Sequence, residues 1–347
     1  MSLVDIKSMF KPELTEFFKE KSYPSYRANQ VYSWLVKGVE TFDEMLNIPK
    51  DLRSLLKEKF YIATAKINRK LVSKLDETVK YLFELHDGEF VEAVLMKYNH
   101  GYTICISTQV GCKMGCKFCA TGKSGFSRNL TASEMLAQIQ SAQLDNNIRI
   151  SNVVLMGMGE PLDNYDNVVR FLRLVSSDDN LNIGMRHISL STCGIINKIY
   201  DLANENFQLT LSVSLHAPND SIRNDLMPIN KKFNVDELLK ACKFYIKKTN
   251  RRISFEYAMI SGVNDSDECA AELAKRLSGM LCHVNLIPVN SVDFASENYK
   301  KSNRERLEKF MNVLAKSGIN ATVRRTLGAD INASCGQLRR KTKNVVV

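Results

Sequence analysis

The sequence predicts an α/β protein with a parallel sheet, preceded by a small helical module. Between residue 101 and about residue 300, six short apolar stretches alternate with stretches of helical apolar spacing. This rhythm is typical of βαβ units, whose strands run parallel. Before residue 65 only helical spacing is found. The periodicity leaves open whether the sheet is open or closed into a barrel.

The first 65 residues are expected to form a helical accessory domain. Helical spacing runs through Lys11–Lys21 and Tyr26–Lys37, and a third helix is expected after Pro49. Alternating residues then predict strands at KLVSKL, VKYLFEL and FVEAVLMKY. We expect these strands, over residues 66–100, to form a bridge into the core.

The core is expected over residues 101–300. Its strands are predicted at 102–107, 152–158, 187–192, 208–215, 252–260 and 283–289. Residues 301–347 are expected to add a helix, a strand and a loop.

Composition indicates a cytoplasmic protein. Of the 347 residues, 44% are hydrophobic and 25% charged, which is ordinary for a soluble globular chain. No apolar run is long enough for a membrane helix, and Asp5 and Lys7 interrupt what would be the apolar region of a signal peptide. In such a chain the nine cysteines point to metal-bound and catalytic thiols rather than to a disulfide scaffold.

The net charge of +10 is partly clustered. Residues 231–252 hold eight basic and two acidic side chains, and the tail from Arg324 is also basic. Such faces suit a phosphate backbone, although a solvated helix face explains them equally well. Charge does not distinguish RNA from DNA.

Three cysteines, Cys112, Cys116 and Cys119, crowd into the stretch GCKMGCKFCA. A structural zinc site needs four ligands, whereas three thiolates can hold a [4Fe–4S] cluster that leaves one iron open to a small molecule. The alternatives are a zinc site that borrows a distant ligand, or three thiols with no common role. The tight spacing favours the cluster.

Polar residues follow several predicted strands, where parallel α/β barrels place their chemistry. The second strand ends in MGMGEP, whose glycines allow close approach of a ligand and whose Glu160 can accept hydrogen bonds from an ammonium group. A plain tight turn is the alternative. A lone His216 would be structural more often than catalytic, but in a ring of polar strand ends it favours a cofactor contact.

The cysteine loop resembles that of the radical S-adenosylmethionine (SAM) superfamily. Over nearly the whole chain, the sequence is similar to the RlmN/Cfr family of radical SAM RNA adenine methyltransferases. The matching motifs are CISTQVGCKMGCKFCATG, LMGMGEPLDNYDNV, SLSTCGI, SLHAPND, MPIN, VNLIPVN and ASCGQL. The resemblance implies a partial (β/α)6 barrel with an N-terminal accessory domain.

The resemblance also implies residue roles. Cys112, Cys116 and Cys119 would bind the cluster. The SAM site would be lined by Gly159, Glu160, Ser191, Ser214, Leu215, His216 and Asn290. Cys335 would carry a methyl group, Cys105 would be its resolving partner, and Glu92 would be the general base. From the alternation of FVEAV alone, Glu92 would be an exposed strand residue.

In the family scheme one SAM methylates Cys335, and a second SAM yields a radical that activates the methyl group for addition to adenine. A covalent protein–RNA intermediate is then resolved by Cys105. The implied partners are 23S rRNA, with tRNA as a second candidate, and an external one-electron donor such as flavodoxin. A monomer without membrane contact is expected.

Within the family, LIPVN and MGMGEP favour the carbon-2 branch over the carbon-8, antibiotic-resistance branch. Two other classes stay open: a glycyl-radical activating enzyme, and an electron-transfer or RNA-binding iron–sulfur protein without SAM chemistry.

Overall fold

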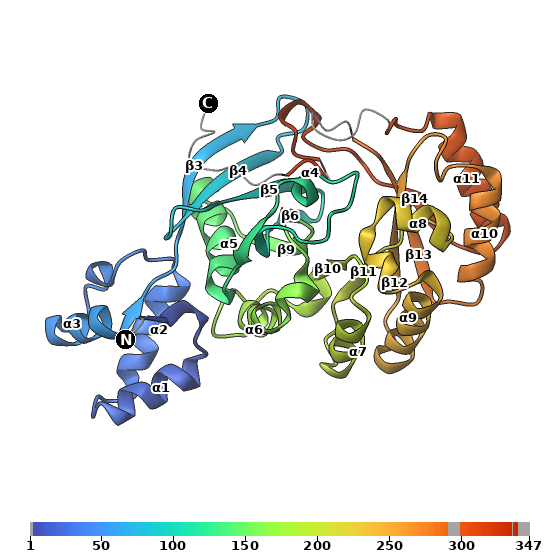
Figure 1. Cartoon of the computed structure of the whole chain (residues 1–347). Coiled ribbons are helices and arrows are strands. Elements are labelled where there is room, and N and C mark those ends of the chain that lie inside the picture. The colour runs from blue at the N-terminus through green and yellow to red at the C-terminus, as the bar shows by residue number, and fades with distance from the viewer. Residues whose placement is uncertain (1–2, 291–298, 335, 339–347) are drawn as a thin grey trace.

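A single ten-stranded sheet runs through the molecule (Figure 1). The computed structural model describes residues 3–290, 299–334 and 336–338. The strand order is β14-β13-β12-β11-β10-β9-β6-β5-β4-β3. The strands are β3 (Ala65–Val72), β4 (Val79–Leu85), β5 (Phe90–Tyr98), β6 (Gly101–Cys105), β9 (Ile150–Leu155), β10 (Ile188–Thr192), β11 (Thr210–Ser214), β12 (Ile253–Met259), β13 (Cys282–Pro288) and β14 (Ala321–Val323).

The part of the sheet from β6 to β14 is entirely parallel. Its strands read as apolar runs because helices cover the outer face, as Figure 1 shows. Those helices are α5 (Ala132–Asn146), α6 (Tyr165–Ser176), α7 (Ile196–Asn204), α9 (Val235–Thr249), α10 (Asp267–Leu277) and α11 (Arg304–Lys316). The sheet ends at β14 on one side and β3 on the other, so the expected partial barrel with six core strands is confirmed.

Strands β3, β4 and β5 extend this sheet in antiparallel fashion beyond β6. The ranges of β4 and β5 agree with the predicted segments. The first of the three predicted strands, at residues 70–75, was misplaced, since β3 begins at Ala65 and ends at Val72. Its alternation is hard to read because five consecutive residues of this edge strand, 66–70, are exposed.

The N-terminal helices pack around a hydrophobic core of their own, separate from the core beneath the sheet. They are α1 (Lys11–Glu20), α2 (Tyr26–Val36) and α3 (Lys50–Lys59), and they lie together at one end of the molecule (Figure 1). Strands β1 (Val4–Asp5) and β2 (Phe60–Tyr61) pair in parallel and bring the two ends of this region together. The side-chain amide of Gln140 on α5 donates to the carbonyl of Leu35 at 3.0 Å and joins the region to the core.

Short elements fill the connections. These are the strands β7 (Gln109–Gly111) and β8 (Phe126–Asn129), the helices α4 (Ala120–Lys123) and α8 (Asp220–Leu226), and the 3-10 turns η1 (Ile6–Ser8), η2 (Phe42–Glu44), η3 (Pro161–Asn164), η4 (Met185–His187), η5 (Pro228–Lys231) and η6 (Ala329–Ile331). Among the described residues, no helix has both the length and the apolar character needed to cross a membrane.

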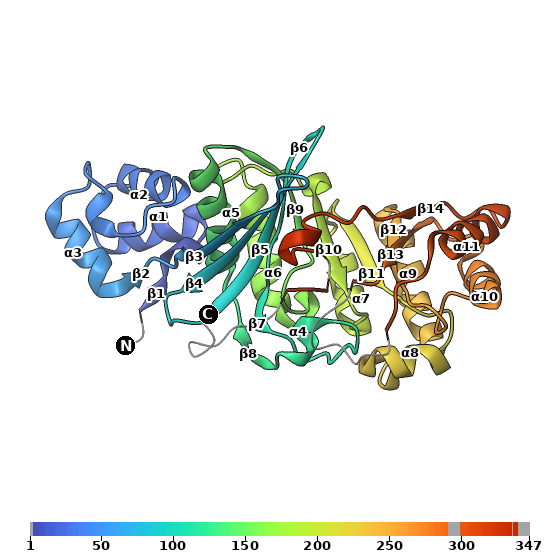
Figure 2. The same cartoon turned by 90° about the horizontal axis from the view of Figure 1, so that it is seen from above.

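The chain after β14 runs back across the sheet toward β4 and β5, as Figure 2 shows from above. Lys80 on β4 donates to the carbonyl of Asn332 at 2.9 Å, which fixes the end of this path. Residues distant in sequence are thereby brought over the strand ends.

Candidate active site

A cavity of about 970 Å³ opens at the carboxyl ends of the parallel strands. The cysteine loop forms one side, and the ends of β9 to β13 form the others. Of the predicted site residues, this cavity collects Cys112, Cys116, Cys119, Gly159, Glu160, Ser191, Ser214, His216 and Asn290. Residues from five separate segments therefore meet where the sequence reading expected a cofactor site.

The cysteine loop is held between β7 and β8, an antiparallel pair that the sequence reading did not identify. The amide of Cys112 donates to the carbonyl of Gly125 at 2.9 Å. Gly111 has a φ of +82°, and a Cβ at this position would lie 1.9 Å from that same carbonyl oxygen. Only glycine lets the two strands approach so closely, and the loop begins from this constrained point.

The three thiols fit a cluster better than a single ion. Burial raises the pKa of Cys112 to about 12, and it raises the pKa of Cys116 as well. Thiolates at such buried positions need a cation beside them. Among the described residues, however, no three His, Cys, Asp or Glu side chains lie close enough to share one metal ion. In a [4Fe–4S] cluster each cysteine binds a different iron, which accommodates this wider spacing.

Glu160 lies beside the loop with its carboxylate buried. It accepts hydrogen bonds from the amides of Cys193, at 2.7 Å, and Leu162, at 3.0 Å. Burial raises its pKa. The preceding Gly159 has a φ of +103°, and a Cβ there would lie 2.8 Å from the backbone nitrogen of Gln109. The arrangement presents a buried carboxylate to a cationic ligand.

His216 is a neutral side chain facing the cysteine loop. Its Nδ1 accepts from the amide of Ala258 at 2.9 Å, so the proton of the neutral ring resides on Nε2. Burial, with the nearby Arg223 charge, lowers its pKa to about 3. The ring packs edge-on against Phe118 with centroids 4.8 Å apart. His216 can therefore donate a hydrogen bond into the cavity over a wide pH range.

Leu215 differs from the other predicted SAM contacts. Its side chain is fully buried, and it is absent from the lining of the cavity as the described residues form it. Its amide donates to the carbonyl of Glu256 at 3.1 Å, and its own carbonyl accepts from Arg223 at 3.0 Å. Leu215 thus holds the end of β11 in place between Ser214 and His216.

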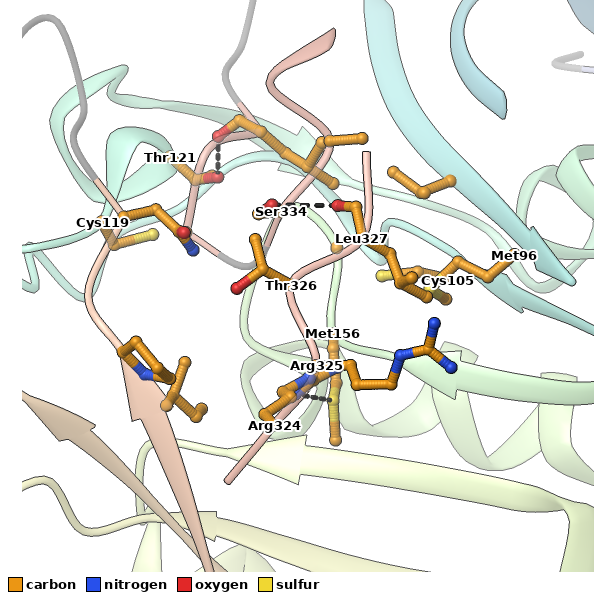
Figure 3. A pocket seen from close by; sticks show the side chains of 18 of the residues that line it. Met96, Cys105, Cys119, Thr121, Met156, Arg324, Arg325, Thr326, Leu327 and Ser334 are labelled. Carbon is orange, nitrogen blue, oxygen red and sulfur yellow. Dashed lines mark hydrogen bonds between the residues drawn. The ribbon is translucent and has the colours of Figure 1, made fainter. Parts of the chain in front are cut away.

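A second pocket, of about 750 Å³, adjoins the first (Figure 3). Cys105 lines it from the end of β6, Met96 lines it from β5, and residues 324–327 cross it. Cys335 lies outside the described residues, but both of its neighbours, Ser334 and Gly336, line this pocket. The two cavities share the lining residues Cys119, Met156, Gly157, Ile287, Asn290, Arg324 and Gly336.

Glu92 is buried, and the prediction of an exposed position was wrong: the residue is 2% exposed. It lies two residues before Val94 on β5, so both side chains face the same side of the strand, and Val94 lines the second pocket. Its carboxylate lies 3.2 Å from the ammonium of Lys80. The chain after β14 covers this face of the sheet, which the local alternation of residues does not reveal.

Three charged residues of the site were missed by sequence reasoning. Glu256 on β12 accepts from the side-chain amide of Asn285 at 2.8 Å and lies 3.6 Å from the guanidinium of Arg324. Arg223 is fully buried and donates to the carbonyls at the ends of two strands. An acidic residue inside the apolar run ISFEYAM was a usable signal for Glu256; nothing in the sequence distinguished Arg223 from a surface arginine.

Two family models match this chain. Residues 106–274 match the radical SAM superfamily, and residues 4–62 match the ribosomal RNA large subunit methyltransferase N-terminal domain. The two matches correspond to the barrel and to the separate helical region.

Full-length relatives are also found. The chain is 52% identical over 340 residues to a probable dual-specificity RNA methyltransferase RlmN of Clostridium tetani, covering 98% of this chain and 97% of that protein. It is 53% identical over 341 residues to the protein of the same name in Alkaliphilus oremlandii, covering 98% and 99%. The crystal structure of a radical SAM methyltransferase from Sphaerobacter thermophilus superposes with a TM-score of 0.91 at 42% identity, covering 96% of this chain and 99% of that one. The chain therefore belongs to the RlmN family of radical SAM RNA methyltransferases.

Proposed function

We propose that this protein transfers a methyl group from SAM to carbon 2 of an adenosine in RNA, by way of a methylated Cys335. Its proposed substrates are 23S rRNA and tRNA. The observation that carries the proposal is the pair of adjoining cavities. The cysteine-loop cavity and the pocket of Cys105 share Cys119 and six other lining residues, so a group bound in one lies beside the other.

The residues proposed to bind the cofactors line the cysteine-loop cavity. Cys112, Cys116 and Cys119 would hold a [4Fe–4S] cluster. Glu160 would accept hydrogen bonds from the ammonium group of SAM, because it is a buried carboxylate beside the loop. Ser191, Ser214 and Asn290 offer further hydrogen bonds from three strand ends. Two SAM molecules are used in each turnover.

The first step belongs to Cys335. Its thiolate attacks the methyl carbon of one SAM, so that a bond from sulfur to the methyl group forms and S-adenosylhomocysteine leaves. A cluster and a second SAM bound in the cavity would supply the one-electron chemistry that removes a hydrogen atom from this methyl group. A ring carbon of adenine bonded to hydrogen is a poor nucleophile, so it is not methylated by simple displacement; the activated methyl group adds to it instead.

The last steps belong to Glu92 and Cys105. Glu92 takes the proton from the substituted ring carbon, and the adduct loses its unpaired electron to an external one-electron carrier of the flavodoxin class. The thiolate of Cys105 attacks the sulfur of Cys335, which forms a disulfide and breaks the bond to the methylene carbon; this carbon takes a proton, and the methylated RNA is released. An external thiol reductant restores both cysteines, and an external one-electron donor of the flavodoxin class restores the cluster.

The experiment compares two cysteine variants under anaerobic conditions with SAM and a substrate RNA fragment. Cys105→Ala is expected to accumulate an RNA–protein species that survives denaturation, because the adduct forms before Cys105 is needed. Cys335→Ala is expected to form neither this species nor methylated RNA. Cys282→Ala is the control and should turn over normally, because Cys282 begins β13 and the cavities lie at the other end of this strand.

Normal release of methylated RNA by Cys105→Ala would contradict the resolving role of this cysteine. Digestion of the product and comparison with 2-methyladenosine and 8-methyladenosine identifies the carbon that is modified. A methyl group on carbon 8 would place the protein with the antibiotic-resistance branch. SAM cleavage without any RNA product would favour an activating enzyme, and an unchanged spectrum of the reduced cluster on addition of SAM would favour an electron-transfer protein.

A further inference from the structure

Lys80 occupies a buried position between the proposed general base and the segment that bears the methyl-carrying cysteine. Its side chain is 9% exposed, and that of Glu92 is 3% exposed. The ammonium lies 3.2 Å from Oε2 of Glu92 and donates to the carbonyl of Asn332 at 2.9 Å. Asn332 is three residues before Cys335. One side chain thus joins β5 to the catalytic segment.

Stability alone does not account for this ion pair. Burying two charges costs several kcal/mol of solvation, and replacing such a pair by apolar residues of similar size is often neutral or stabilising. The neighbouring strand positions are apolar, as the buried pattern of β4 shows. A pair retained in such surroundings calls for a role that needs the charges.

Anchoring the segment does not require Lys80 either. The turn between β3 and β4 already binds it by three other contacts. Asp76 accepts from the amide of Gly328 at 2.9 Å, and Asp330 accepts from the hydroxyl of Ser73 at 2.6 Å and from the amide of Lys74 at 2.9 Å. Lys80 differs from these contacts in that its ammonium also touches the Glu92 carboxylate.

We propose that Lys80 is a positioning residue for the reaction. It orients the Glu92 carboxylate, offsets its buried charge and fixes its position relative to the segment that carries Cys335. The inference rests on the proposed function. A carboxylate that must take a proton from an adduct on Cys335 has to be held at a fixed place relative to that cysteine. The shared contacts of Lys80 supply this relation, since they bind the carboxylate and the backbone of the segment at once.

Lys80 is then needed at one stage of the reaction, the removal of the proton by Glu92. Methylation of Cys335 and cleavage of SAM precede proton removal and do not use Glu92. Loss of Lys80 should therefore leave both intact and slow the release of methylated RNA, so that the covalent RNA–protein species accumulates.

The experiment uses the full-length reconstituted protein and compares Lys80→Met, Lys80→Gln and Lys80→Arg with Lys97→Met. Lys97 is the matched control: it lies on β5 and pairs with Glu77 at the surface, at 3.1 Å, with 54% of its side chain exposed. Lys80→Met and Lys80→Gln are expected to release methylated RNA at least about tenfold more slowly than wild type, because a misplaced general base loses part of its contribution to the rate. Both should accumulate the adduct, keep wild-type iron content and form 5′-deoxyadenosine as wild type does in the first turnover. Lys80→Arg, which keeps the charge, should recover part of the rate, and Lys97→Met should behave as wild type.

A double variant, Lys80→Met with Glu92→Gln, tests whether the two residues act together. It should be no slower than Glu92→Gln alone, because residues that act through one another are not additive. Release at the wild-type rate by either Lys80→Met or Lys80→Gln would overturn the inference, and so would full additivity. Failure of the proposed function would look different, since the wild-type protein itself would then form no methylated adenosine.

Discussion

Arg223 and Cys193 are joined inside the protein by a hydrogen bond of 2.7 Å from the guanidinium of the arginine to the carbonyl of the cysteine. The same nitrogen donates to the carbonyl of Ser214 at 3.1 Å. The ends of β10 and β11 are thereby held by one fully buried charge beneath the candidate SAM site.

Replacing Arg223 by Met is expected to lower the free energy of unfolding by about 3 kcal/mol or more, since several buried carbonyls would lose their donor at about 1–3 kcal/mol each. Affinity for SAM should fall as well, because Ser214 loses its support. Denaturant unfolding and SAM binding measure the two effects. Arg304→Met is the control, since Arg304 is 92% exposed and pairs with Glu308 across the surface of α11; its loss should change stability by less than about 0.5 kcal/mol. Equal effects of the two substitutions would refute a structural role for the buried arginine.

The cysteine loop predicts a defined iron content. Anaerobically reconstituted protein should carry about four irons per chain, as one [4Fe–4S] site requires. Cys112→Ala, Cys116→Ala and Cys119→Ala should each lose iron and abolish SAM cleavage, whereas Cys282→Ala should keep both. Iron analysis and the visible spectrum provide the measurement. Tight binding of zinc in place of iron would rule out the cluster.

Lys7 predicts a pH dependence of stability in the N-terminal region. Burial lowers its pKa from an ordinary value of 10.5 to about 8, against the opposing effect of Asp5 and Glu40. The unfolded chain therefore binds this proton more tightly than the folded one, and the charged lysine destabilises the fold at pH 7. The penalty shrinks as the pH rises from 8 to about 10.5.

Lys7→Met should accordingly raise the free energy of unfolding at pH 7 by about 3 kcal/mol. The gain over wild type should decrease steadily between pH 8 and 10.5. Denaturant unfolding at a series of pH values checks this, with the exposed Lys50→Met as control. A gain that stays constant over this interval would show that the titration of Lys7 does not contribute.

The two ends of the basic segment 231–252 lie at different distances from the cysteine-loop cavity. Met227, four residues before Lys231, lines the cysteine-loop cavity, and η5 leads from there into α9. The helix then ends at Thr249, next to the start of β12, at the end of the parallel strands that lies away from the cavity. Lys231 and Lys232 therefore lie near the cavity, and Lys247 and Lys248 lie far from it.

Charge reversal at Lys231 and Lys232 is expected to weaken binding of a substrate RNA fragment and to lower the slope of log affinity against log salt by about 1.4 for two single-strand phosphate contacts. The same change at Lys247 and Lys248 is the matched control and should have a smaller effect. A titration at several salt concentrations decides this. The reverse order of effects would mean that RNA reaches the outer helices.

Patterns among neighbouring residues correctly predicted the elements whose burial repeats along the chain. The strand–helix rhythm placed the six core strands, and the polar residues that follow them do meet in one cavity. Glu92 and Arg223 show where such reasoning stops. Glu92 is buried by a segment more than 230 residues later in the chain, and Arg223 is buried because backbone carbonyls from distant strand ends converge on it. Neither cause is visible within a window of neighbouring residues. The pair β7–β8 was missed for a related reason, since three- and four-residue strands leave no periodicity to read.

Under the proposed mechanism, the lining residues that the two cavities share would impose an order on the binding of SAM and RNA. Met156, Asn290 and Arg324 face both spaces, so a molecule that occupies one restricts what the other can admit. If Cys335 is methylated as proposed, RNA that binds before this step would compete with the SAM that donates the methyl group. High RNA concentration should therefore inhibit the uncharged protein, and a pre-incubation with SAM should relieve this inhibition.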